Sequence, residues 1–178
     1  MKNSVYSRKQ EENMESKLII IRGNSGSGKT TTSKKLQNYL GHGTLLVSQD
    51  VVRREMLKVQ DREGNLSIDL IRQIAEYGKD KCEFVIVEGI LYESHYGEML
   101  RHLIRFYHQE TFTYYFDLSF EETVARHNNR SKKMEFGEES LQAWWKPNDY
   151  LDVEEETLLT NDMSQDDVME LILSQLQR

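Results

Sequence analysis

The sequence predicts an α/β fold in which one parallel β-sheet lies between two layers of helices. Short apolar runs, such as KLIIIR at residues 17–22 and FVIV at residues 84–87, are typical of strands buried on both faces. These runs alternate with amphipathic helical patterns, as expected for parallel strands joined by right-handed crossovers. The 178 residues suit one domain and show no internal repeat or interdomain linker. We therefore expect a single three-layer domain over residues 17–178.

The individual elements follow from local signals along the chain. Gly41 ends the first helix, Ser119 and Glu122 have the spacing of a capping box, and Ser164 fits the N-cap of the last helix. Residues 1–16 show no periodicity, so we expect a mobile N-terminal arm there. We expect strands at 17–22, 44–47, 84–87, 111–117 and 157–160, and helices at 29–40, 51–60, 66–82, 94–109, from 119 onward, around 144–147 and at 165–176.

Composition and charge limit the classes of protein that fit. The formal net charge is −7, but residues 149–178 alone carry nine acidic residues and one basic residue, so the acidity belongs to the C-terminal end and does not exclude an anionic ligand elsewhere. The single cysteine, Cys82, excludes an intramolecular disulfide and a Cys-rich zinc site, and it suits a reducing compartment. No apolar run approaches the ~18 residues of a membrane span, and the polar start of the chain does not read as a signal peptide. We expect a cytoplasmic protein without a membrane partner.

The strongest motif is GNSGSGKT at residues 23–30, a full match to G-x-x-x-x-G-K-[ST] between a predicted strand and a predicted helix. Its glycines let the backbone curl so that N–H groups point at phosphates, and the helix N-terminus adds partial positive charge. Lys29 is expected to reach the β- and γ-phosphates of ATP, and the Thr30 hydroxyl to ligate Mg²⁺. We expect the nucleotide to be held by Gly23, Asn24, Ser25, Gly26, Ser27, Gly28, Lys29, Thr30 and Thr31.

Other classes of phosphate-loop protein lack support in the sequence. There is no NKxD segment to read guanine, and DREG at residues 61–64 follows no apolar strand, so it is a weak imitation of a GTPase switch motif. No arginine-rich second domain of the kind found in AAA-type motors is present. The remaining interpretation is a small phosphotransferase.

Two carboxylates follow predicted strands, where ligands bind in open α/β sheets. Asp50 is expected to orient or deprotonate the acceptor hydroxyl, with Arg53, three residues on, holding an anionic part of the acceptor and Arg54 facing elsewhere. Glu88 stands where a metal-holding acid is expected, but glutamate followed by Gly89 leaves two roles open. It holds Mg²⁺, directly or through water, or it orients the acceptor.

Two arginines at a helical spacing complete the predicted site. Arg126 and Arg130 lie four apart and lead into a basic loop, so both project from one helix face toward it. Such guanidiniums can close over ATP and neutralise charge in the transition state. Which of the two contacts adenine and which the phosphates stays open.

Taken together, the motifs at residues 23–30, 50–53, 88–89 and 126–130 resemble those of P-loop kinases related to nucleoside monophosphate kinases. The similarity is greatest to the polynucleotide kinase, zeta-toxin and chloramphenicol phosphotransferase group, and to bacterial proteins labelled "predicted kinase" or "uridine kinase". The resemblance implies a P-loop NTPase fold with five parallel strands in the order 2-3-1-4-5, a helical lid at about 131–148, and ATP with Mg²⁺. It also implies that the loop near Asn161 flanks adenine.

The sequence thus predicts an ATP-dependent phosphotransferase that acts on a hydroxyl of a small-molecule or nucleoside-like acceptor. Lys29, Asp50, Arg126 and Arg130 are its expected catalytic residues. A nucleic-acid 5′-end kinase and a non-catalytic ATP-binding regulator stay as alternatives; nucleic acid is disfavoured because no long basic stripe is evident. The acceptor and the oligomeric state are open, and candidates for stacking on the acceptor are Tyr92, His95, Tyr96, Phe136, Trp144, Trp145 and Tyr150.

Overall fold

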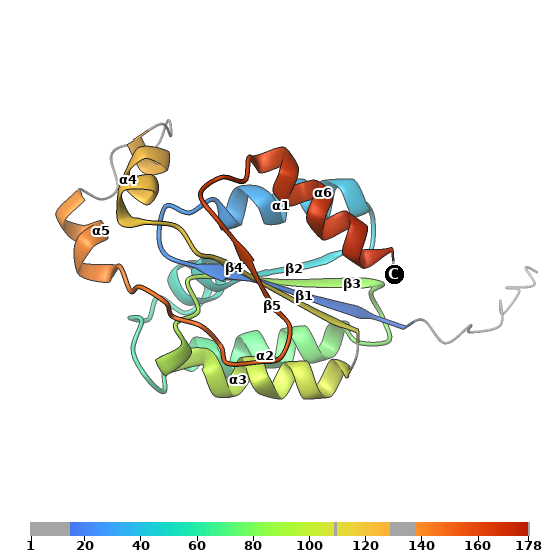
Figure 1. Ribbon diagram of the computed structural model, residues 1–178. Helices are drawn as coiled ribbons and strands as arrows, with labels where there is room; N and C mark the ends of the chain where they lie inside the picture. The colour runs from blue at the N-terminus through green and yellow to red at the C-terminus, as the bar shows by residue number, and fades with distance from the viewer. Residues whose placement is uncertain (1–14, 109, 129–137, 178) are drawn as a thin grey trace, which may run out of the picture.

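A five-stranded parallel sheet forms the centre of the molecule, which the computed structural model describes over residues 15–108, 110–128 and 138–177. Its strand order is β2-β3-β1-β4-β5, as predicted, and every pairing is parallel (Figure 1). β1 is the central strand, so the loop that leaves its carboxyl end lies at the middle of the sheet edge. The strands are β1 (Lys17–Gly23), β2 (Leu45–Ser48), β3 (Phe84–Gly89), β4 (Thr111–Phe116) and β5 (Glu156–Leu159).

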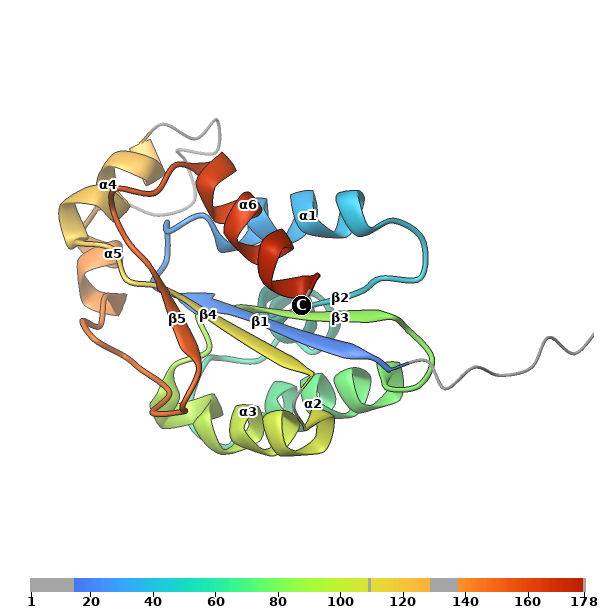
Figure 2. The same ribbon diagram turned by 45° about the vertical axis from the view of Figure 1, so that its right-hand side comes forward.

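Helices cover both faces of the sheet (Figures 1 and 2). α1 (Lys29–Leu40) and α6 (Gln165–Leu176) pack on one face, and α2 (Leu66–Gly78) and α3 (Glu93–Tyr107) pack on the other. Successive residues of β1 point to opposite faces, so the isoleucines at 19 and 21 join the α1/α6 core and the apolar residues at 18 and 20 join the α2/α3 core. This is why the centre of β1, residues 18–21, is apolar without interruption, and it confirms the three-layer prediction.

Two shorter helices lie beyond the carboxyl ends of the strands (Figure 1). They are α4 (Phe120–Asn128) and α5 (Glu138–Trp144), which contact each other. The predicted lid at 131–148 falls partly on residues 129–137, outside the described residues, and its described part contains α5. None of the described helices is long and apolar enough to cross a membrane.

The segment after β2 differs from the prediction of a helix over residues 51–60. It is a single π-helical stretch, η1 (Val51–Met56), in which the amide of Leu57 donates to the carbonyl of Val52, five residues back, at 3.1 Å. π-Helical turns are rare and frequently occur at functional sites.

The predicted helix caps are present at both serines. The Ser119 hydroxyl accepts from the amide of Glu122 at 3.2 Å. Ser164 forms a full capping box with Asp167, with hydrogen bonds of 3.2 Å and 2.8 Å. These local signals therefore fix where α4 and α6 begin.

One buried cation links segments that are distant in sequence. Arg22, next to last in β1, is fully buried, and its guanidinium bonds Glu156 at 2.9 Å and Asp149 at 2.8 Å. Its Nε and Nη2 also lie 3.4 Å from the carbonyl of Leu91. Burial raises the pKa of Asp149, while Arg22 acts in the opposite direction. The cluster fixes the loop after β3, the chain entering β5 and the end of β1 against one another.

We expect Arg22→Met to lower the free energy of unfolding by about 3–5 kcal/mol, because it leaves two buried carboxylates without their cation. Urea denaturation followed by tryptophan fluorescence measures this. Lys35→Met is the control, because Lys35 pairs with Asp166 on the surface at 3.8 Å and its removal should leave stability nearly unchanged. Equal urea midpoints for wild type and Arg22→Met would contradict the role given to this cluster.

Candidate functional site

The glycine-rich loop curls between β1 and α1 with all three of its glycines at positive φ. The value is 140° at Gly23 and 87° at Gly26. A Cβ atom at Gly23 would lie 2.9 Å from Cβ of Phe116, and one at Gly26 would lie 3.0 Å from the carbonyl oxygen of Thr123. Any other residue at these two positions would be strained and would collide with β4 or α4. The motif glycines thus allow the loop to lie tightly against its neighbours.

Lys29 lies inside this loop rather than in solvent. It is 7% exposed, and its Nζ donates to the carbonyl of Asn24 at 2.6 Å and to Oγ of Ser27 at 3.2 Å. The loop encloses a small cavity of about 90 Å³, here called the loop cavity. It is lined by Ser25, Gly26, Gly28, Lys29, Thr30, Asp50, Glu88, Gly89 and Ile90. Five of the nine residues predicted to hold the nucleotide, Ser25, Gly26, Gly28, Lys29 and Thr30, therefore line one concave space at the N-terminus of α1.

Glu88 is positioned by the hydroxyl groups on either side of it. It is 2% exposed; one carboxylate oxygen accepts from Thr30 at 3.1 Å and the other from Ser48 at 2.5 Å. Oxygen donors of this kind suit Mg²⁺, which also keeps several waters and substrate phosphates as ligands. No group of three acidic, histidine or cysteine side chains that could hold a metal occurs within the described residues. Thr30 and Glu88 therefore fit a Mg²⁺ that is bound together with phosphate and not on the protein alone.

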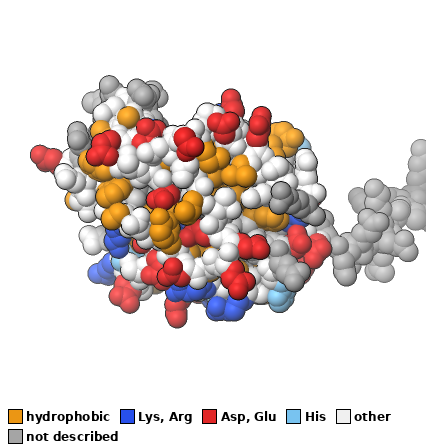
Figure 3. Space-filling model, viewed as in Figure 1, with side chains coloured by type: hydrophobic (Ala, Val, Ile, Leu, Met, Phe, Trp, Pro, Cys, Tyr) orange, Lys and Arg blue, Asp and Glu red, His pale blue; other side chains and the backbone are white. Residues whose placement is uncertain are grey.

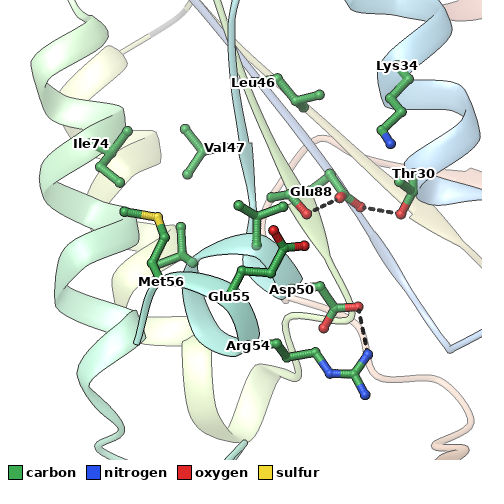
Figure 4. Close-up of a pocket in the computed structure, with 13 residues that line it drawn as sticks. Thr30, Lys34, Leu46, Val47, Asp50, Arg54, Glu55, Met56, Ile74 and Glu88 are labelled. Carbon is green, nitrogen blue, oxygen red and sulfur yellow. Dashed lines mark hydrogen bonds and ion pairs between the residues drawn. The ribbon is translucent and has the colours of Figure 1, made fainter. Parts of the chain in front are cut away.

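A larger cavity opens beyond Glu88 at the β2 edge of the sheet. This edge cavity, of about 730 Å³, shares Thr30, Asp50 and Glu88 with the loop cavity. Figure 4 shows the Glu88 carboxylate directed toward Thr30, with mostly apolar side chains on the other walls. Those walls include Leu46, Val47, Val52, Met56 and Ile74.

Asp50 follows β2 and is held by two arginines of η1. Its Oδ1 accepts from Nη2 of Arg53 at 3.1 Å, and Nη1 of Arg54 lies 3.9 Å from its other oxygen (Figure 4). The prediction that Arg54 faces elsewhere is therefore wrong, because residues three and four positions on in a helical segment lie on the same side as Asp50. Arg54 is exposed, as expected for a surface residue. Arg53 also donates to the carbonyl of Val59 at 3.3 Å.

A third space, the side cavity, lies next to the loop cavity and has a volume of about 340 Å³. The two cavities share Ser25, Asp50 and Ile90. Asp50 thus stands at the boundary between the space beside the glycine-rich loop and a second space large enough for a small molecule. The side cavity is lined by Ser25, Asp50, Arg53, Arg54, Gln60, Asp61, Ile90, Tyr92 and Trp144.

Two of the predicted aromatic candidates, Tyr92 and Trp144, line the side cavity. The Tyr92 hydroxyl donates to the carbonyl of Trp144, and burial raises the pKa of Tyr92 to about 12, so it stays protonated. Trp145 instead packs edge-on against Phe120, with ring centroids 5.9 Å apart. The two tryptophans therefore do not share a direction, as expected for neighbours on a helix.

The other aromatic candidates lie elsewhere. Tyr96 is fully buried, and Tyr150 packs against Tyr115 with ring centroids 5.5 Å apart. His95 lies edge-on to Tyr92, with ring centroids 5.9 Å apart. Phe136 lies outside the described residues.

Asp61 is a site residue that sequence reasoning missed. Its carboxylate accepts from Gln49 at 3.1 Å and from the Tyr96 hydroxyl at 2.8 Å, while it lines the side cavity. Its surroundings in the sequence show neither a strand nor a periodic pattern. The partners lie 12 and 35 residues away, so only the fold brings them together.

Arg126 reaches the glycine-rich loop from α4. Its Nη1 donates to the carbonyl of Ser27 at 3.1 Å, and its Nε pairs with Glu122 at 2.6 Å. Arg130, the other predicted lid arginine, lies outside the described residues.

Asn161 accepts a hydrogen bond from the amide of Ser119 at 3.1 Å and so helps to hold the start of α4. Thr31 is exposed in the first turn of α1.

The side chain of Asn24 attaches the glycine-rich loop to the chain that follows α5. It donates to the carbonyl of Lys146 at 2.7 Å and accepts from the amide of Lys146 at 2.9 Å. Lys146 in turn donates to Ser94 at 3.1 Å and lies 4.4 Å from the ring centre of Tyr92. The chain that follows α5 is thus attached both to the glycine-rich loop and to the start of α3.

Comparison with known proteins decides the family. Residues 18–146 match the family model described as AAA domain, a P-loop domain. The chain belongs to the AAA domain family. No curated protein matches it.

Solved structures with the same fold as this AAA domain protein include small P-loop kinases. A gluconokinase from Sinorhizobium meliloti 1021 superposes with a TM-score of 0.66 at 13% identity, covering 93% of this chain and 94% of that one. The APS kinase of Mycobacterium tuberculosis, solved with AMPPNP and APS, gives 0.66 at 16% identity, covering 92% and 99%. Shikimate kinase from Acinetobacter baumannii, solved with shikimate, gives 0.59 at 19% identity, covering 92% and 94%. These likenesses confirm the predicted fold.

We expect Asn24→Ala to speed hydrogen exchange at the amide of Lys146 roughly 30-fold, since it removes two hydrogen bonds that contribute about 1 kcal/mol each. Native-state exchange measured by NMR resolves this amide. Ser25→Ala, a neighbouring change in the same loop that leaves the bonds to Lys146 in place, is the control. Unchanged exchange at Lys146 in Asn24→Ala would show that the anchor lies elsewhere.

Proposed function

We propose that this protein is an ATP-dependent kinase that transfers the γ-phosphoryl group of ATP to a hydroxyl of a small-molecule acceptor. The observation that carries the proposal is the position of Asp50, on the boundary shared by the loop cavity and the side cavity. Phosphates in the first space and a hydroxyl in the second would both lie beside one carboxylate. The fold shared with a gluconokinase, an APS kinase and a shikimate kinase supports the same reaction class.

The glycine-rich loop would bind the phosphates of ATP. Its backbone N–H groups and the N-terminus of α1 supply fixed partial charge that needs no reorganisation during the reaction. Lys29 would transfer hydrogen bonds from its present oxygen partners to the β- and γ-phosphates. Arg126, already at Ser27, would add positive charge as the γ-phosphoryl group leaves, and Arg130 and Asn161 complete the proposed nucleotide site.

Thr30 and Glu88 would hold Mg²⁺, with Glu88 acting directly or through water. The ion would neutralise charge on the phosphates. Both oxygens of Glu88 are already directed at the hydroxyls of Thr30 and Ser48. Of the two roles left open for Glu88, this contact with Thr30 favours the metal.

Asp50 would position the acceptor hydroxyl and take its proton. In the transfer step a bond forms between the acceptor oxygen and the γ-phosphorus, and the bond between that phosphorus and the bridging oxygen of ADP breaks. The hydroxyl proton passes to the Asp50 carboxylate. Arg53 and Arg54 hold that carboxylate at the cavity boundary.

A nucleic-acid 5′-end kinase fits the described surface less well. On the face shown in Figure 3, acidic side chains lie over α6 and are interspersed with the Lys and Arg side chains at the lower edge. Strong binding to a phosphate backbone requires a run of phosphate contacts by Lys and Arg.

The direct test is ADP release in the presence of a panel of sugars, polyols, nucleosides and 5′-hydroxyl oligonucleotides. We expect Asp50→Asn to bind ATP normally and to lose at least about a hundredfold in kcat, within the range attributed to acid–base catalysis. Lys29→Ala should weaken both ATP binding and turnover. The exposed Asp166→Asn is the matched control. A transfer-competent Asp50→Asn enzyme would remove the proposed role, and ATP turnover that no acceptor stimulates would favour a nucleotide-sensing regulator.

We expect Glu88→Gln to raise the Mg²⁺ concentration needed for half-maximal activity, since an amide is a weaker ligand for Mg²⁺ than a carboxylate. Titration of Mg²⁺ at saturating ATP and acceptor measures this. The KM for the acceptor should change little. A raised acceptor KM with an unchanged Mg²⁺ requirement would assign Glu88 to the acceptor instead.

A further inference from the structure

Hydrogen bonds from side chains that take no part in the proposed phosphoryl transfer hold Asp61 in place. Gln49, which is 1% exposed, donates to one oxygen of Asp61 and accepts from the amide of Leu91 at 3.2 Å. The fully buried Tyr96 donates to the other oxygen and receives a hydrogen bond from Asn65 at 3.3 Å. The carboxylate is therefore held rigidly at the wall of the side cavity. Such support is typical of a group whose position matters for binding.

We propose that Asp61 is a specificity-determining residue that binds a second hydroxyl of the acceptor, and that the acceptor is a polyhydroxylated small molecule such as a sugar or cyclic polyol. The inference rests on the proposed kinase function. Asp50 and Asp61 line the same cavity from different segments, so a molecule within it meets two hydrogen-bond acceptors. An ionised carboxylate only accepts hydrogen bonds, so each of the two needs a donor from the ligand, and hydroxyls supply one.

The remaining lining residues suit the same class of molecule. Tyr92 and Trp144 present aromatic surface, which packs against the C–H face of a sugar ring. The volume of about 340 Å³ is at the low end for small-molecule sites and suits one ring better than an oligonucleotide end.

The charged residues that line the side cavity favour a polyol over a phosphate-bearing acceptor. The arginines of the cavity are paired with Asp50, at 3.1 Å for Arg53 and 3.9 Å for Arg54. Asp61 accepts hydrogen bonds from an uncharged amide and an uncharged hydroxyl, and Nδ1 of His95 lies 3.7 Å from one of its oxygens. A phosphate placed beside this carboxylate would be repelled by its negative charge, whereas a hydroxyl can donate a hydrogen bond to it.

The test compares polyols with their monodeoxy analogues, in wild type and in Asp61→Asn. D-glucose, D-gluconate, D-ribose and shikimate are screened first by ADP release, and the best of them is then assayed against each available monodeoxy form. In wild type we expect one analogue, lacking the phosphorylated hydroxyl, to be inactive. A second analogue, lacking the hydroxyl that Asp61 binds, should lose about 100-fold or more in kcat/KM, because the hydrogen bond from the acceptor to this carboxylate is lost. In Asp61→Asn, the values of kcat/KM for the polyol and for this second analogue should differ by no more than about threefold. The KM for ATP should be unchanged.

Two further variants separate binding from a structural role. Glu63→Gln, an exposed change in the same loop, should retain the full discrimination. Tyr96→Phe removes a hydrogen bond to Asp61 from the side away from the cavity, and it should lower kcat/KM while preserving most of the discrimination between the polyol and its analogue. Thermal melts confirm that each variant is folded. A merely structural Asp61 would lower activity toward all acceptors equally and leave the ratio unchanged, which would overturn the proposal.

The outcomes also separate this inference from the function on which it rests. If nucleosides or 5′-hydroxyl oligonucleotides stimulate ADP release and polyols do not, the polyol inference fails while the kinase function stands. If no hydroxyl compound stimulates ADP release although ATP binds, both fail.

Discussion

A fully buried guanidinium at the end of β1 is the interaction on which the site depends. Arg22 stands one residue before the glycine-rich loop, and two carboxylates from the C-terminal part of the chain neutralise it. A charge buried this deeply is costly unless all its donors are satisfied, so the surrounding segments have little freedom to move. The same carboxylate of Asp149 also accepts from the amide of Glu93, at the start of α3, at 3.0 Å. These contacts thereby fix the walls of the side cavity relative to β1, the strand that leads into the glycine-rich loop.

The site is assembled by a few polar contacts that span the chain. Asn24 attaches the end of α5 to the glycine-rich loop, Arg126 attaches α4 to the same loop, and Glu88 links the start of α1 to β2. Each contact joins elements that meet at the carboxyl ends of the strands, where open α/β folds bind ligands. The apolar layers determine where the helices lie, and these polar contacts determine which side chains face the cavities.

The sequence was sufficient wherever a residue type is required by local geometry. Gly23 and Gly26 occupy positions where a Cβ atom would collide, and the capping serines begin their helices where the spacing indicated. It was insufficient where a role depends on tertiary contacts. Asp61 acquires its place only through Gln49 and Tyr96, which come from distant segments of the chain. The acidic C-terminal segment is a similar case, since the carboxylates of Asp149 and Glu156 lie inside the fold beside Arg22 instead of on its surface.

The central claim is that Asp50 separates a phosphate site from an acceptor site and that phosphoryl transfer occurs across it. Phosphorus NMR of a reaction containing the protein, ATP, Mg²⁺ and the most stimulating polyol tests this most directly, because it identifies where the γ-phosphate goes. The account predicts a new phosphomonoester resonance that grows in step with ADP and is absent when the acceptor is omitted. Release of the γ-phosphate as inorganic phosphate alone, at a rate that does not depend on the acceptor, would contradict it.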